Sequence, residues 1–421
     1  MSCNCDSHVS RRAFLGGAAA AGLMATARPM WAAAPNFGPT PRGKIKACIM
    51  LFLNGGASQF ETWSPAEGQK TGGPTKALAT NVEGVSISEN LPKLATRADR
   101  LTVLRAMTAH IPAHEPAREF MHTGHSPNAT LAYPAVASVV CKEFADSRID
   151  LPGFISINGA GHDEGFLEAE YAPFVVRNAM QPVENVDPGK AVTDKQLKDR
   201  RDLLEALEKN FQSERKAQEL LQKRQDTYAN AQKLMDTPLL KAFDVTQEPE
   251  KVRQPFGDHA FGQGCLMARR LVQAGVKFVE VVLGGWDTHQ DNFNRAGELA
   301  HQLDDGFAAL LDDLAAQKML DETLIVCTTE FGRTPRINEN DGRDHYAKAF
   351  SAAVAGGGVS TGFVLGDVDA EGNEVTDRPV EVGELTALMY ERFGIEYTKT
   401  IYSPRGRPMK LSEKTPIKEL I

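Results

Sequence analysis

KACIMLFL, residues 46–53, is a continuous apolar run that ends at Asn54-Gly55-Gly56. Such a run is typical of a strand that is buried on both faces of a parallel sheet. Similar runs recur along the chain and alternate with segments of helical periodicity, which predicts an α/β fold whose mostly parallel central sheet carries helices on both faces. We expect strands at residues 46–53, 100–107, 152–158, 276–283, 323–329 and 349–356, and helices at 133–144, 259–274, 294–318 and 384–393.

Composition and charge indicate a globular protein that does not bind nucleic acid. The chain has 421 residues, of which 42% are hydrophobic, so it is long enough to bury a sizeable core. Its net charge is −8 and it has no long basic run, whereas binding to a nucleic-acid backbone needs a concentrated positive face. We expect buried free thiols at the apolar, widely spaced cysteines Cys48, Cys141, Cys265 and Cys327.

Residues 1–34 have the pattern of an export signal. Ser10-Arg11-Arg12-Ala13-Phe14-Leu15 is a twin-arginine pattern, and the apolar stretch that follows is too short and too rich in Ala and Gly to span a bilayer. We therefore expect a periplasmic or secreted protein without an integral membrane span. Residues 35–421 are expected to form a single domain.

Residues from about 190 to 245 differ in composition from the rest of the chain. They are rich in Lys, Arg, Glu and Gln, and their leucines recur at near-helical spacing. This pattern predicts a long helical hairpin inserted in the domain, with charges on a solvated face. A substrate lid or a partner surface is the alternative use of these charges.

Polar side chains gather directly after the predicted strands. Because ligands bind beyond the carboxyl ends of the strands in such sheets, we expect these polar segments to share one edge. In the segment GGWDTH, Asp287 and His289 offer a carboxylate and an imidazole, which suit zinc, manganese or iron. The polar segments are residues 54–61, 110–125, 284–289 and 330–336.

Histidines are concentrated in the second of these segments. We expect at least one of its members to bind a metal ion. His122 is the member for which we most expect a purely structural role, on a helix surface or in the core. The histidines of this segment are His110, His114, His122 and His125; we assign structural roles to His162 and His259.

The segment HEPAREFMHTG, residues 114–124, places Pro116, Arg118 and Thr123-Gly124 at fixed offsets from His114. This spacing resembles the sulfatase signature, in which a cysteine stands at the first position. Further motifs occur in the order LFLNGGASQFETWSP (51–65), HTGHSP (122–127), LGGWDTHQDNF (283–293), EFGRTPRI (330–337) and GRDHY (342–346).

On these motifs the chain resembles the alkaline phosphatase/sulfatase superfamily and, more closely, an exported bacterial domain-of-unknown-function family, number fifteen-oh-one, from about residue 44 to residue 411. The resemblance implies an alkaline-phosphatase-like α/β fold with metal ions at the sheet edge. Two positions depart from the superfamily pattern, because Asn54 replaces an aspartate ligand and Phe331 a histidine ligand. The implied ligands are Asp287, His289, Glu330 and His345, together with Asn54.

A tetrahedral phosphoryl or sulfuryl group needs positive charge on its oxygens and a nucleophile in line. We expect His114 to be this nucleophile, or a metal ligand beside an activated water, with Arg118 as its catalytic partner. Guanidinium groups can grip two oxygens at once, so we expect anion clamps at Arg118, Arg333, Arg336 and Arg343.

Two functions stay open at this stage. The first is a metal-dependent hydrolase or transferase of small or polymeric phosphate or sulfate esters, with a divalent zinc, manganese or calcium ion; the retained Asp287, His289, Glu330 and His345 favour it. The second is a catalytically silent relative that binds an anionic ligand or a partner protein in the bacterial envelope, which Asn54 and Phe331 favour. A purely structural surface protein is a third possibility and would leave the polar segments unexplained.

Overall fold

The structure, a computed structural model, describes residues 45–145, 149–184, 186, 193–211, 231 and 233–421. The predicted export signal lies outside these residues, as do residues 212–230 of the predicted helical hairpin. Of that hairpin the structure describes helix α5, Asp194–Phe211, so the hairpin itself stays a prediction. No helix among the described residues combines the length and the apolar character that crossing a bilayer requires.

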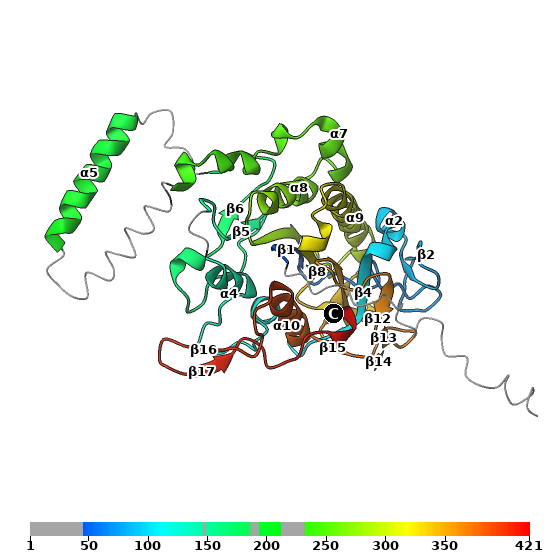
Figure 1. Cartoon of the computed structure of the whole chain (residues 1–421). Helices are drawn as coiled ribbons and strands as arrows, with labels where there is room; N and C mark the ends of the chain where they lie inside the picture. Colours follow the sequence, from blue (N-terminus) through cyan, green and yellow to red (C-terminus); the bar gives the residue numbers. More distant parts are fainter. Residues whose placement is uncertain (1–44, 146–148, 185, 187–192, 212–230, 232) are drawn as a thin grey trace, which may run out of the picture. The chain divides into compact units, whose positions relative to one another are not determined.

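The apolar runs form one nine-stranded central sheet, whose order is β12-β4-β11-β8-β1-β7-β5-β6, with β15 pairing β4 (Figure 1). The recorded strand pairs are parallel except for those of β11, which runs antiparallel to both β4 and β8. The predicted mostly parallel sheet is therefore confirmed. Its strands are β1 (Ala47–Asn54), β4 (Leu101–Thr108), β5 (Phe154–Ile157), β6 (Phe174–Val176), β7 (Phe278–Gly284), β8 (Thr323–Thr328), β11 (Phe350–Gly356), β12 (Phe363–Leu365) and β15 (Val380–Glu381).

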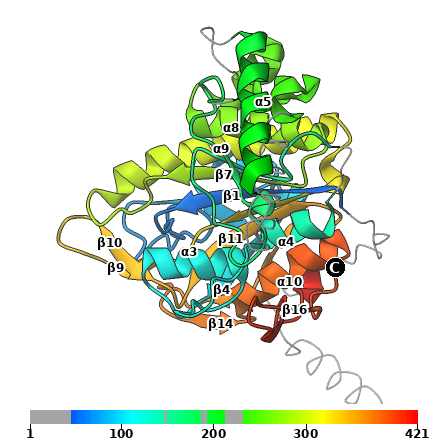
Figure 2. The ribbon, with the colours of Figure 1, turned by 90° about the vertical axis from the view of Figure 1, so that its left-hand side faces the viewer.

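Both faces of the sheet are covered, because alternate residues of each strand point to opposite sides. In β1, Ile49 and Leu51 pack into one hydrophobic cluster with residues of α8 and α9, and Met50 and Phe52 pack into another with residues of α4 and α10. Figure 2 shows α8 and α9 on one side of the sheet and α4 and α10 on the other. These helices are α4 (Val136–Glu143), α8 (Ala260–Gln273), α9 (Asn292–Ala316) and α10 (Val382–Phe393).

Apart from the hairpin, the predicted helices and strands are all present, with ends that differ by a few residues. Local chemistry explains several of these ends. His259 caps α8, because its Nδ1 accepts a hydrogen bond from Gly262 N, and Glu381 and Glu384 form a capping box on α10. The cysteines Cys48, Cys141, Cys265 and Cys327 are buried and free, as expected.

Smaller elements surround this core. The helices are α2 (Pro92–Ala95), α3 (His114–Thr123) and α7 (Glu250–Arg253). The strand pairs are β2 (Ala77–Ala79) with β3 (Ser86–Ser88), β9 (Gly332–Ile337) with β10 (Arg343–Tyr346), β13 (Asp367–Val368) with β14 (Val375–Asp377), and β16 (Thr400–Tyr402) with β17 (Pro408–Lys410). The short 3-10 helices are η2 (Ala98–Arg100), η3 (Ala169–Tyr171), η4 (Pro238–Phe243), η5 (Val245–Gln247), η6 (Gln254–Phe256), η7 (Leu320–Glu322) and η8 (Lys418–Leu420).

The carboxyl ends of the central strands meet at one edge, as the sequence predicts. The last residue of β1, Asn54, is in register with Gly284 of β7, and Phe52 of β1 is in register with Thr328, the last residue of β8. Because β11 runs the opposite way, its first residue lies at this same edge. The β9–β10 hairpin, which lies between β8 and β11 in the chain, therefore also lies at this edge.

Asp304 joins α9 to the start of α2. It is buried, and its two carboxylate oxygens accept hydrogen bonds from Lys93 N (2.9 Å) and Leu94 N (2.8 Å). Since α2 has no side-chain cap of its own, Asp304 supplies the acceptors that the first turn of this short helix lacks.

We expect Asp304→Ala to lower the free energy of unfolding by about 3 kcal/mol, because two backbone N–H groups lose charged acceptors. The neighbouring Asp305, whose exposed ion pair with Lys93 Nζ is at the surface, is the matched control, and Asp305→Ala should cost less than about 1 kcal/mol. Urea unfolding measures both values, and equal losses would contradict this role of Asp304.

Candidate metal centre

The loops after β1 and β7 approach each other closely at the sheet edge. Trp286 N donates a hydrogen bond to Asn54 O (3.3 Å), and Gly55 adopts a φ of +116°, which favours glycine. A Cβ at Gly55 would lie 2.6 Å from Asp287 N. The Asn54-Gly55-Gly56 turn therefore allows the backbone that carries Asp287 to pack against the end of β1.

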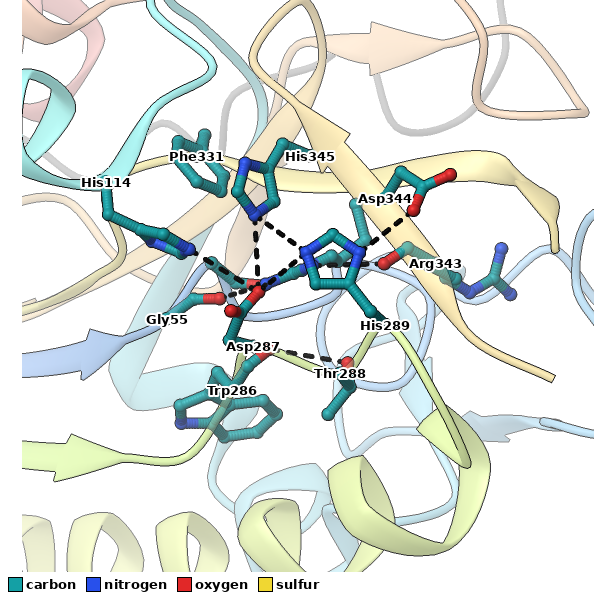
Figure 3. Close-up of polar contacts among 12 residues, drawn as sticks. Gly55, His114, Trp286, Asp287, Thr288, His289, Phe331, Arg343, Asp344 and His345 are labelled. Atoms are coloured by element: carbon teal, nitrogen blue, oxygen red, sulfur yellow. Dashed lines mark hydrogen bonds and ion pairs between the residues drawn. The ribbon is translucent and has the colours of Figure 1, made fainter. Parts of the chain in front are cut away.

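Three imidazoles converge on one oxygen of Asp287 (Figure 3). Asp287 Oδ1 lies 3.4 Å from His114 Nε2, 3.1 Å from His289 Nε2 and 3.2 Å from His345 Nε2. The Nε2 atoms of His289 and His345 are 3.0 Å apart. His114, Asp287 and His345 offer ligand atoms that all lie within 4.8 Å of one another, so these residues could hold a metal ion.

Each of these imidazoles uses its other nitrogen to contact an acceptor. His114 Nδ1 lies 2.9 Å from Glu330 Oε1, His289 Nδ1 lies 2.9 Å from Asp344 Oδ1, and His345 Nδ1 lies 2.9 Å from Pro112 O. Since a carbonyl or carboxylate oxygen only accepts, each Nδ1 carries a proton. A neutral ring then has its lone pair on Nε2, which faces Asp287. Metal-binding histidines are usually held in this way.

His114 Nε2 itself is buried and has no hydrogen-bond partner among the described residues. A buried nitrogen with a free lone pair is costly unless a proton donor or a cation meets it. This orphaned atom is the feature of the site that best fits a bound ion.

Glu330 follows β8 and contacts His114 without facing Asp287. Its Oε1 also accepts a hydrogen bond from Gly55 N (2.9 Å), and its Oε2 accepts one from Thr329 Oγ1 (3.1 Å). The structure therefore brings the expected ligand Glu330 to the site, but with both oxygens already engaged. This geometry fits a residue that orients His114.

The expected anion clamps Arg333 and Arg343 are fully buried. Arg333 donates to the carbonyls of Gly55, Gly56 and Arg343, and its Nη2 lies 2.6 Å from Asp287 Oδ1. Arg343 forms a buried ion pair with Glu61 (3.1 Å) and donates to backbone carbonyls. Both guanidiniums direct several of their N–H groups to backbone carbonyls, so both hold the loops of the site together.

Arg118 lies one helical turn after His114 on α3 and differs from these buried arginines. Its side chain is 34% exposed, its Nη2 pairs with the exposed Glu115, and its Nη1 lies 3.4 Å from Asn54 Oδ1. Asn54, an expected ligand, thus faces Arg118, and no measured contact joins it to Asp287. The further candidate Arg336 is exposed on β9.

Phe331, at the position of a lost histidine ligand, is buried and packs on two of the imidazoles. Its ring centroid lies 5.0 Å from that of His114 and 4.6 Å from that of His345. It therefore forms an apolar wall of the site. The other histidines of the same polar segment point elsewhere: His110 contacts Ser126 Oγ, His125 contacts Leu411 O, and His122 contacts Glu280.

Charge keeps Asp287 ionised. Burial alone would raise the pKa of this carboxyl, but the hydrogen bond and charge of Arg333 lower the pKa to about 2. The hydrogen bond with Glu330 raises the pKa of His114, whereas burial lowers that of His345. The site thus offers an anionic oxygen at neutral pH, as a divalent cation requires.

Asp344 and the carbonyl of Pro112 are site groups that the sequence reasoning did not identify. Asp344 stands beside His345 in β10, where alternation would send neighbouring side chains to opposite faces. The pairing of β10 with β9 shifts register between Arg343 and His345, and such irregularities re-aim side chains. The strand pattern alone therefore could not indicate that both Asp344 and His345 reach His289.

We expect Gly55→Ala to weaken zinc binding and to lower the unfolding midpoint, because the new Cβ collides with the backbone that carries Asp287. Gly84→Ala is the matched control, since Gly84 also has a positive φ (+77°) but open space around it. Both changes impose backbone strain of about 1 kcal/mol or more. Isothermal titration with zinc separates the two effects; equal zinc affinity in both variants would contradict the close-approach argument.

Comparisons with known proteins agree with the motifs. The family model described as "Protein of unknown function (DUF1501)" matches residues 45–421. The comparison with curated proteins found no match.

Among solved structures, the PsFucS1 sulfatase from Pseudoalteromonas sp. is 13% identical with a TM-score of 0.42, over 84% of this chain and 68% of that one. The C-terminal periplasmic domain of EcEptC from Escherichia coli, in complex with Zn, is 10% identical with a TM-score of 0.39, over 90% and 96%. A protein in the alkaline phosphatase superfamily from Vibrio parahaemolyticus is 11% identical with a TM-score of 0.35, over 84% and 67%.

The family match covers residues 45–421. It confirms the resemblance to the domain-of-unknown-function family that the motifs indicated. The chain belongs to the family described as "Protein of unknown function (DUF1501)".

Proposed function

We propose that this chain is a metal-dependent hydrolase or transferase of phosphate or sulfate esters. Asp287, through Oδ1, and His114, His289 and His345, through Nε2, would hold one divalent transition-metal ion. The observation that carries this proposal is the convergence of the imidazole Nε2 atoms on Asp287 Oδ1 while every Nδ1 is tied to an acceptor.

The spacing of these ligand atoms supports an ion of zinc size. Ligands about 2.0–2.1 Å from a tetrahedral zinc ion lie about 3.4 Å from one another. The measured separations between Asp287 Oδ1 and the imidazole nitrogens run from 3.1 to 3.4 Å. Imidazole and carboxylate ligands together favour zinc, manganese or iron over the calcium that the sequence analysis also considered.

His289 is the most exposed of these imidazoles, and it is the residue we assign to the outer position of the ligand set. His114, Asp287 and His345 alone form a three-ligand group of the kind found in catalytic zinc sites, which keep a position open for water or substrate. The ion would supply a Lewis acid for an ester oxygen and lower the pKa of a bound water to about 7.

The protein's own groups would bind and orient the ester. The side chain of Asp287 is 48% exposed, so the site would be open to a substrate. Arg118 would leave Glu115 and place its guanidinium on two oxygens of the phosphoryl or sulfuryl group. Arg333 would hold Asp287 in place, and Glu330 would fix the tautomer of His114 so that Nε2 faces the ion.

A second candidate function is ligand binding without turnover. The burial of Arg333 and Arg343 favours it, because transfer of an anionic group needs charge at the reacting oxygens and Arg118 is the arginine that remains available at the described site. In this case the same centre would bind an anionic ligand or a partner protein in the bacterial envelope.

We also propose export of the protein by the twin-arginine route, with residues 1–34 as the signal and residues 35–421 as one domain. The pattern at Arg11-Arg12 supports this assignment. Twin-arginine export moves folded proteins, so the metal ion would be bound before the protein reaches the periplasm or the exterior. The ester substrate would then be a small or polymeric anion of the cell envelope.

Elemental analysis of protein purified without chelator tests the metal centre. We expect about one transition-metal ion per chain in the wild type, and loss of most of it in Asp287→Ala and His345→Ala, since each change removes a central ligand. His289→Ala should keep a weakened site. His125→Ala, which alters a histidine outside the centre, should keep the full metal content. Wild-type protein that stays free of metal after loading with zinc or manganese would refute the centre.

Turnover of a panel of phosphate and sulfate esters separates the enzyme from the binding protein. On any ester that the wild type hydrolyses, we expect Arg118→Ala to lower kcat/KM about 100-fold, the size of effect seen when one transition-state donor is removed. Its metal content should not change. Binding of inorganic phosphate or sulfate without any turnover in the panel would favour the second candidate function.

A further inference from the structure

The centre depends on two elements that lie far apart in the chain. His114 is the first residue of α3, and Asp287 follows β7. A single metal ion can bind both His114 and Asp287 only while their side chains stay close together. Helix α3 therefore has to keep one position relative to β7. A buried contact between α3 and β7 lies away from the ligands, at His122 and Glu280.

His122 is buried two helical turns, about 12 Å, beyond His114 on α3. Its Nε2 lies 2.7 Å from Glu280 Oε1, and its Nδ1 lies 2.8 Å from Arg118 O on its own helix. Glu280, in the middle of β7, is 1% exposed, and its Oε2 accepts a hydrogen bond from Ser156 Oγ of β5 (3.2 Å). The His122 ring also packs on Phe52 of β1, with centroids 4.6 Å apart.

The partners of His122 fix where its protons are. Arg118 O can only accept, so Nδ1 carries a proton. A neutral ring would then turn the lone pair of Nε2 toward the ionised carboxylate of Glu280 at 2.7 Å, which is repulsive. The pair must therefore hold one further proton between Nε2 and Oε1. Burial lowers the pKa of His122, but the Glu280 carboxylate more than offsets this effect and raises the pKa.

We propose that the buried His122–Glu280 pair is a positioning device that locks α3 against β7 and so sets the separation of His114 from Asp287. This inference rests on the proposed metal centre. Hydrophobic contacts have little directionality and would tolerate a shift of the helix along the sheet. A slip of α3 by one turn, about 5.4 Å, would leave both buried groups without partners, and that outcome is strongly disfavoured.

The surroundings of the pair favour this role over that of a second catalytic group. Gly161 packs against the carboxylate of Glu280, because a Cβ added to Gly161 would lie 3.2 Å from Glu280 Oε2. The half-buried His162 stacks on the His122 ring with centroids 5.7 Å apart. These neighbours and the burial of both side chains keep the pair out of a substrate's reach.

The test is the zinc dissociation constant, measured by competition with a chromogenic chelator. His122→Leu combined with Glu280→Leu replaces the pair by apolar side chains, a change that often leaves stability intact. We expect this double variant to unfold at a similar urea concentration but to bind zinc about 10-fold more weakly, in the range seen when outer partners of ligands are removed. The visible spectrum of its cobalt form should also change, because the ligand geometry shifts.

Two further variants make the result specific. Glu280→Gln should bind zinc like the wild type, because its amide can donate to Nε2 while Nδ1 still donates to Arg118 O. Met121→Ala removes a neighbouring buried side chain of α3 and leaves the pair intact, so its zinc affinity should also stay near that of the wild type.

The outcomes separate this inference from the proposed centre. Absence of zinc binding by the wild type overturns both. Wild-type binding with an unchanged dissociation constant in the double variant overturns the positioning role alone. An equal loss in Met121→Ala also overturns it, since general packing of α3 would then account for the effect.

Discussion

Asp287 Oδ1 is the atom on which the site depends. It carries a negative charge, and three imidazole nitrogens lie 3.1 to 3.4 Å from it. Their lone pairs would repel the oxygen and one another unless positive charge lies between them. Arg333 donates one N–H to this oxygen and brings positive charge to one side of the group. A cation at the centre of the group would resolve the remaining repulsion, and the hydrogen-bonded Nδ1 atoms would keep the lone pairs directed at it.

The fold brings these groups together through one property of its sheet. Parallel neighbours β1, β7 and β8 end at the same edge, and the reversed strand β11 starts there, so the hairpin that carries His345 reaches the residues that follow β7. Buried ionic contacts then fix the loops: Arg333 joins the turn after β1 to Asp287, and Arg343 joins the hairpin to Glu61. Arg333 and Arg343, expected to bind an anion, thus hold the loops of the site together, and our proposal assigns anion binding to Arg118.

Much of this could be predicted from the sequence, because its causes are local. Apolar runs predicted the strands. Because the carboxyl ends of parallel strands share one edge of the sheet, the segments around His114, Asp287 and Glu330 were expected to lie near one another. Spacing could not say which way a side chain faces. It did not distinguish Glu330 as a ligand from Glu330 as the partner of His114, nor an exposed from a buried arginine. The pairing of His122 with Glu280 joins residues 158 positions apart, and no local pattern reports such a contact.

The most direct test of the account is a crystal structure of the purified protein with anomalous diffraction recorded at the absorption edge of the metal it contains. We predict a single strong anomalous peak about 2.0–2.2 Å from Asp287 Oδ1 and from the Nε2 atoms of His114 and His345, with His289 Nε2 beside it. An anomalous map without a peak among these atoms, or with the metal held elsewhere, would contradict the central claim.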